Sequence, residues 1–86
     1  MQINFSDKAF AEYVDWQSRD KATAKRINKI LQEMMRDPFD GIGKPEPLKH
    51  ELSGCWSRRI DEKNRILYQV AEDRETIYII QCKGHY

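Results

Sequence analysis

Two four-residue polar segments in the second half of the chain limit its fold most strongly. They are Asp61–Asn64 and Glu72–Glu75. They separate three runs rich in β-branched and aromatic residues, which are Trp56–Ile60, Arg65–Ala71 and Thr76–Cys82. Such runs between polar turns predict β-strands. Because a parallel return needs a dozen or more residues, gaps of four predict consecutive antiparallel hairpins.

The first half has the periodicity of two helices joined by a tight junction. Ser6 and Asp20 are N-cap candidates for helices over Asp7–Arg19 and Lys21–Arg36. The second helix is expected to end before Pro38, because a proline disfavours α conformation in the residue that precedes it. The apolar face expected for the first helix contains Phe10, Tyr13, Val14 and Gln17, with Ala9 and Trp16 at its margin. The stripe of the second contains Ala24, Ile27, Ile30, Leu31 and Met34.

These elements predict one α+β domain over residues 1–86. Gln2–Phe5 alternates polar and apolar residues and is expected to add a short strand. The order β-α-α-β-β-β then predicts an antiparallel twisted sheet with a helical hairpin packed on one face. The segment Pro38–Pro47 holds all three prolines and is expected to be a loop. Neither side of it is long enough to bury a core alone.

Charge and hydropathy exclude several classes of protein. Fifteen lysines and arginines against 14 aspartates and glutamates give a net charge of +1. Proteins that coat nucleic acid by bulk electrostatics are far more basic, so a nucleic-acid role needs a local patch or a positioning partner. The longest apolar run, Ile77–Ile80, is far shorter than the roughly 20 residues of a membrane span. The first residues lack the features of a secretory signal, and we expect a cytoplasmic protein.

The cysteine pattern carries no evident chemistry. Without an export signal, reduced thiols are favoured over a disulfide for Cys55 and Cys82. No Cys/His spacing matches a zinc site, and we expect neither a metal nor another cofactor. Ser53 and Ser57 lack the context of a catalytic triad.

Side-chain alternation places two arginines together. Ile66, Tyr68 and Val70 form the apolar set of one run, and Trp56 and Ile60 that of the run before it. The residues of opposite parity include Ser57, Arg59, Arg65, Leu67 and Gln69. Arg59 and Arg65 are thus expected to be neighbours on the face that the helices leave open, at some cost in stability. The alternative is two solvated arginines beside Asp61 and Glu62.

Other ionisable groups are candidates for the same face. Glu46 lies between two prolines, so it projects from a stiffened loop. Lys49 and His50 follow at the expected start of a strand, and His85-Tyr86 closes the chain. The alternative for this terminal pair is a frayed tail.

A carboxylate, an imidazole, cations and an aromatic ring suit metal-free RNA cleavage. In that reaction the ribose 2′-OH attacks its own 3′-phosphate, so the substrate supplies the nucleophile. The protein must accept one proton, donate another and stabilise a charged phosphorane. An aromatic ring can stack on a base, which contributes about 1–3 kcal/mol. These residue types occur together in most domains, so they permit this chemistry without identifying it.

Several motifs together resemble a known family. They are Gly43–His50, Leu52–Gly54, Trp56–Ile60, Arg65–Tyr68 and the terminal His85-Tyr86, with Tyr13–Gln17 and Pro38-Phe39 in the first half. The chain resembles the YoeB-type (Txe/YoeB) toxins of bacterial type II toxin–antitoxin systems, within the RelE superfamily. The combination of a proline-flanked glutamate, a Trp-Ser-Arg-Arg-Ile strand and a terminal His-Tyr is highly specific.

The resemblance implies a RelE-like fold and a ribosome-dependent endoribonuclease, an mRNA interferase that cuts message in the ribosomal A site. It implies Glu46 as general base, His85 as general acid, Arg65 as phosphorane stabiliser and Tyr86 as the residue that orients the nucleotide. Arg59 and Lys49 are implied as further phosphate or rRNA contacts. Lys44 and His50 are either rRNA contacts or ordinary surface residues. The implied partners are the 70S ribosome with mRNA, a YefM-like antitoxin and a second copy of the toxin.

Two other functions stay open on the sequence. One is a ParE-like toxin that blocks a protein partner without cutting RNA. The other is a small RNA-binding regulatory module with an inactive site. Expression of such a module is expected to be harmless and to leave no new 5′ ends in translated message.

Overall fold

The two predicted N-caps set the helical hairpin. In the computed structural model, which describes residues Met1–Tyr86, α1 spans Asp7–Arg19 and α2 spans Lys21–Arg36. Ser6 Oγ accepts a hydrogen bond from the Ala9 amide at 3.0 Å, and Asp20 Oδ1 accepts one from the Thr23 amide at 3.0 Å. The Asp20 amide also donates to the Trp16 carbonyl, so one residue ends α1 and begins α2. The Thr23 amide, with the Thr23 hydroxyl, lowers the pKa of Asp20.

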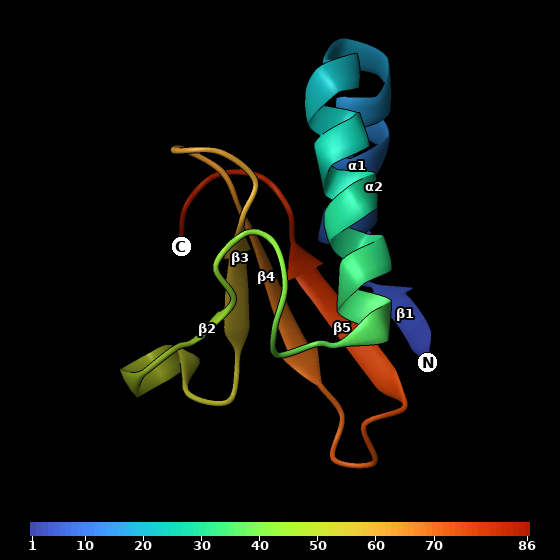
Figure 1. Ribbon diagram of the computed structural model, residues 1–86. Coiled ribbons are helices and arrows are strands. Elements are labelled where there is room, and N and C mark those ends of the chain that lie inside the picture. The colour runs from blue at the N-terminus through green and yellow to red at the C-terminus, as the bar shows by residue number, and fades with distance from the viewer.

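One five-stranded sheet lies against this hairpin, and both helices cover the same face (Figure 1). The strands are β1 (Gln2–Phe5), β2 (Glu46–Pro47), β3 (Trp56–Arg59), β4 (Arg65–Val70) and β5 (Thr76–Gln81). Their order in the sheet is β1-β5-β4-β3-β2. The pairs β3–β4 and β4–β5 are antiparallel hairpins, as the four-residue gaps predict. Neither helix is long and apolar enough to cross a membrane.

Two expectations about the strands were wrong. The sheet is mixed rather than antiparallel throughout, because β1 pairs with β5 in parallel. A long connection through the hairpin and three strands separates them, so no short turn forces an antiparallel return. Lys49 and His50 do not begin a strand either. The strand in that region is β2, and His50, with φ 58°, begins a 3₁₀ turn, η1 (His50–Leu52).

The face of α1 that meets the core also differs from the expected one. Ala9 and Trp16 are the buried residues of α1, whereas Phe10 and Val14 are 55% and 49% exposed. Small Ala9 lets the helix lie close to the chain at Cys82, and the Trp16 indole donates to the Cys82 carbonyl at 2.8 Å. These contacts rotate the helix so that the residues expected at the margin become the buried stripe. The stripe predicted for α2 is confirmed at Ala24, Ile27, Ile30 and Met34.

A β-bulge near the end of β5 decides where the last residues point. Tyr68 pairs with Ile79, but Leu67 pairs with Gln81, so β5 contains one extra residue. The alternation of side chains shifts by one, and Cys82 becomes part of the core beside Ile77 and Ile79. Both cysteines are free, as expected. Burial, with a smaller effect from the Glu12 carboxylate, raises the pKa of the Cys82 thiol to about 12.

Candidate functional site

Pairing of β2 with β3 places Glu46 on the open face of the sheet. Glu46 lies opposite Ser57, and two further backbone hydrogen bonds extend the pairing, from Leu48 to Cys55 at 2.9 Å and from Arg59 to Gly43 at 2.6 Å. Gly43 has φ 85°, and a Cβ there would lie 3.0 Å from the Arg59 carbonyl oxygen. This close approach requires glycine and fixes the loop that precedes Glu46.

The buried guanidinium of Arg58 holds the same loop from the other face. Arg58 is 0% exposed and donates to three backbone carbonyls and one hydroxyl. Its partners are Asp37 O at 2.7 Å, Asp40 O at 3.0 Å, Ile42 O at 3.3 Å and Tyr68 Oη at 3.2 Å. Tyr68 Oη in turn donates to Pro38 O at 2.7 Å, and burial raises the pKa of Tyr68 against the opposing effect of Arg58. The sequence interpretation gave Arg58 no role, although its parity matches that of Trp56 and Ile60.

Arg59 and Arg65 face each other across β3 and β4, as side-chain alternation predicts. Arg65 Nη1 donates to the backbone carbonyls of Asp61 and Asn64, while Nε and Nη2 have no protein partner. The Arg59 side chain is exposed and makes no hydrogen bond. The three ion pairs of the molecule involve other residues, so neither guanidinium has a carboxylate within 4.0 Å.

The Asp61 carboxylate, beside these arginines in sequence, accepts hydrogen bonds within its own turn. Asp61 accepts hydrogen bonds from the Lys63 and Asn64 amides and from the Asn64 side chain. Burial acts to raise the pKa of Asp61, but these hydrogen bonds and the Arg65 charge together hold it below its usual value. The alternative of solvated arginines beside Asp61 and Glu62 is met in part. Arg59 is exposed, and Arg65 donates to the Asp61 carbonyl, although neither arginine forms an ion pair. Like charges placed opposite each other cost stability.

The terminal residues lie over the open face instead of fraying. In Figure 1 the C-terminal tail crosses from the end of β5 toward β3. Tyr86 Oη donates to Ser57 Oγ at 3.0 Å, and Ser57 is 3% exposed. The His85 and Tyr86 rings lie 5.1 Å apart between centroids, and His85 Nδ1 is 3.3 Å from the Tyr86 O atom. Ser57 is thus a support for Tyr86, a role that sequence reasoning missed.

The remaining candidates are separate exposed side chains. Lys44 and His50 have positive φ values of 50° and 58°, and Lys49 precedes η1. None of the three side chains forms a hydrogen bond or ion pair with another residue. They flank β2, which is an edge strand. The structure therefore gathers Glu46, Arg59, Arg65 and Tyr86, with exposed His85 beside Tyr86, and leaves Lys44, Lys49 and His50 along one border.

This arrangement combines a carboxylate, two cations without an ion pair and an imidazole on an open surface. The three hollows of the molecule are lined by other residues, the first by Phe39, Trp56 and Arg74 and the others along α2. A small ligand buried in a cavity is therefore not what the site is shaped for.

Comparison with known proteins identifies the family of the chain. A family model described as the YoeB-like toxin of bacterial type II toxin–antitoxin systems matches residues 5–86. The chain belongs to this family. The toxin YoeB of Synechocystis sp. is 50% identical over 86 residues, which cover 100% of this chain and 98% of that one.

Two solved structures share the whole fold. The YoeB dimer from Staphylococcus aureus has a TM-score of 0.89 and 42% identity, and the match covers 100% of this chain and 98% of that one. The YoeB–YefM complex from the same organism has a TM-score of 0.87 and 42% identity, with 98% and 95% covered. This YoeB-like chain is therefore the toxin of a toxin–antitoxin system.

Proposed function

We propose that this toxin is a metal-independent, ribosome-dependent endoribonuclease that cuts mRNA in the ribosomal A site and stops translation. Family membership supports a nuclease-type activity in general. The single observation that carries the specific proposal is the pair Arg59–Arg65, two guanidiniums without counterions on the same face as Glu46. A phosphodiester that enters this face supplies the missing negative charge.

The chemistry assigns one task to each group. Glu46 accepts the proton of the ribose 2′-OH as that oxygen attacks the adjacent phosphorus. Arg65, through its free Nε and Nη2, stabilises the phosphorane, and Arg59 and Lys49 add phosphate contacts. His85 donates a proton to the departing 5′-oxygen, which leaves a cyclic phosphate on one fragment and a 5′-OH on the other. Tyr86, supported by Ser57, orients or stacks on the nucleotide.

The ribosome supplies what an open site cannot. A shallow surface with two guanidiniums has no walls to hold a flexible RNA, and the net charge of +1 is too small for tight binding of free RNA. The ribosome already fixes the message, and Lys44 and His50 beside β2 are assigned as rRNA contacts. We expect little cleavage of free RNA. Equal cleavage with and without 70S ribosomes would contradict this dependence.

Two protein partners complete the proposal. The S. aureus YoeB is found as a dimer and in complex with YefM. By this likeness we assign a YefM-like antitoxin and a second toxin copy to this chain. A toxin that acts on ribosomes and is neutralised by an antitoxin acts in the cytoplasm.

The decisive experiment maps 5′ ends in ribosome-bound message under single-turnover conditions. Glu46→Gln and His85→Ala are expected to keep ribosome binding and to lose on the order of 10²–10⁴ in rate. Glu51→Gln in η1 is the matched control, because Glu51 is also exposed but lies outside the site. A wild-type protein that is toxic but produces no new ends would favour a ParE-like blocking toxin. A harmless protein without new ends would favour a regulatory module.

A further inference from the structure

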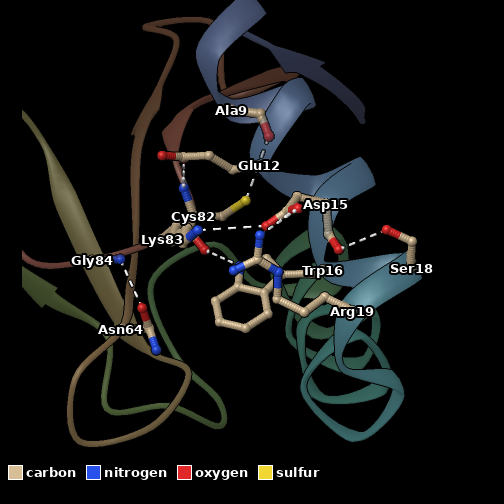
Figure 2. A network of polar contacts seen from close by, with 10 residues as sticks. All are labelled: Ala9, Glu12, Asp15, Trp16, Ser18, Arg19, Asn64, Cys82, Lys83 and Gly84. Carbon is tan, nitrogen blue, oxygen red and sulfur yellow. Dashed lines mark hydrogen bonds and ion pairs between the residues drawn. The ribbon is translucent and has the colours of Figure 1, made fainter.

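Three residues between the sheet and the terminal pair are held from two sides. Beyond Gln81 the strand β5 ends, and the backbone of Cys82 is engaged by side chains of α1 instead of by a neighbouring strand (Figure 2). The Cys82 amide donates to Glu12 Oε1 at 2.8 Å, and the Cys82 carbonyl accepts from Trp16 Nε1 at 2.8 Å. Its thiol is 3.5 Å from the Ala9 carbonyl. Side chains of α1 thus replace the lost ladder partners.

Asn64, in the turn between β3 and β4, holds the other side. Asn64 Oδ1 accepts from the Gly84 amide at 2.7 Å, while Asn64 Nδ2 donates to both carboxylate oxygens of Asp61 at 3.1 Å. The Gly84 carbonyl accepts from the Arg65 amide at 3.1 Å. Asp61 therefore fixes the orientation of the Asn64 amide, and Asn64 fixes the backbone at Gly84.

The turn at Gly84 sets the direction in which the terminal residues leave the point held by Asn64. Gly84 has φ 77°, a conformation that a side-chain-bearing residue adopts only with strain, although a Cβ there would meet no atom within 4 Å. The next two residues are His85 and Tyr86. A chain end without such attachment normally frays, and a displacement of about 1 Å costs about 10²-fold in rate.

We propose that Glu12, Trp16 and Asn64 are positioning residues that set the placement of His85 and Tyr86 over β3. None of the three belongs to the group that contacts substrate in the proposed function, on which this inference rests. Glu12 and Trp16 act through Cys82, and Asn64 acts through Gly84. The exposed contact of Lys83 with Asp15 at 3.5 Å adds little, because exposed ion pairs are weak.

The first test measures tail order without any activity. Glu12→Ala, Asn64→Ala and Trp16→Phe are compared with Glu12→Gln, which keeps an oxygen acceptor for the Cys82 amide. Amide hydrogen exchange at Cys82 is expected to quicken in Glu12→Ala but not in Glu12→Gln, and exchange at Gly84 is expected to quicken in Asn64→Ala. Unchanged exchange in both alanine variants would overturn the attachment itself.

The second test separates positioning from general destabilisation. Under single-turnover conditions at saturating ribosomes, Asn64→Ala and Trp16→Phe are expected to lose about 10–10²-fold in rate with unchanged ribosome affinity. Glu12→Gln is expected to keep the wild-type rate. In a His85→Ala background the Asn64→Ala change is expected to cost less, because one of the two groups that it positions is absent. An equal loss in both backgrounds, or wild-type rates in the single variants, would overturn the inference.

Failure of the proposed function gives a different result. Wild-type toxin that cuts no RNA would refute that function, and the exchange measurements would still decide whether these residues order the tail.

Discussion

Replacement of the two adjacent arginines in β3 is expected to affect two different properties, stability at one position and RNA cleavage at the other. Arg58 is 0% exposed and serves four acceptors, whereas Arg59 is exposed and its side chain has no partner. Methionine at either position keeps most of the apolar stem and removes the guanidinium. Arg58→Met should therefore lower the free energy of unfolding, and Arg59→Met should lower the rate of RNA cleavage.

The magnitude for Arg58 follows from the groups left without a donor. The carbonyls of Asp37, Asp40 and Ile42 each lose a charged partner, and Tyr68 Oη loses one as well. A polar group left unsatisfied costs about 1–3 kcal/mol, and the low end applies to carbonyls of a loop near water. We expect a loss of about 3–5 kcal/mol, which lowers Tm by roughly 12–40 °C in a domain of this size. That is a large part of the roughly 5–15 kcal/mol available to a small domain.

Urea unfolding followed by circular dichroism measures the difference. Arg59→Met is the matched control and should stay within about 0.5 kcal/mol of wild type, because it is exposed and its removal relieves repulsion from Arg65. Arg58→Lys keeps the charge without the fork of donors and should lose an intermediate amount, which provides a measurable value if Arg58→Met does not fold. Arg58→Met with wild-type stability, or equal losses of stability at both positions, would refute the conclusion that Arg58 holds the loop of Asp37–Ile42 in place.

Four further predictions concern the terminal residues, the two cysteines and Asp61. A tag fused after Tyr86 should depress cleavage, because His85 Nδ1 lies beside the Tyr86 O atom; full activity of a directly tagged protein would contradict this. Cys55 should react with a thiol reagent in the native protein while buried Cys82 reacts only on unfolding. The pKa of Cys82 is raised from 9.0 to about 12, so its contribution to stability is complete below pH 9 and is lost as pH rises toward 12. In Cys82→Ala the free energy of unfolding should therefore fall less steeply between pH 9 and 12, as measured by urea unfolding at each pH. The lowered pKa of Asp61 contributes stability above its ordinary value of 3.8 that is lost as pH falls further, so Asp61→Asn should be less sensitive to acid in urea titrations than wild type.

Local signals in the sequence were sufficient for most of the secondary structure and for part of the site. Ser6, Asp20 and Pro38 mark helix ends through contacts within a few residues, so both helix ranges are confirmed. Four-residue turns allow only antiparallel returns, and alternation then brings Arg59 opposite Arg65. The same alternation contained the signal for Arg58, which was missed because a buried arginine is rarely expected.

Long-range packing decided the rest. The parallel pairing of β1 with β5 and the rotation of α1 onto Ala9 and Trp16 depend on partners more than 60 residues apart. The bulge in β5 arises in its pairing with β4 and has no signal in the sequence pattern. The path of the terminal His85-Tyr86 depends on the bulge and on α1, since the bulge turns Cys82 toward α1 and Gly84 then meets Asn64. Short-range capping and turn preferences were therefore enough to specify the elements and the residue types of the site. Only the tertiary structure could place the terminal pair, because its position is set by side chains of α1 and of the turn before β4 that hold Cys82 and Gly84.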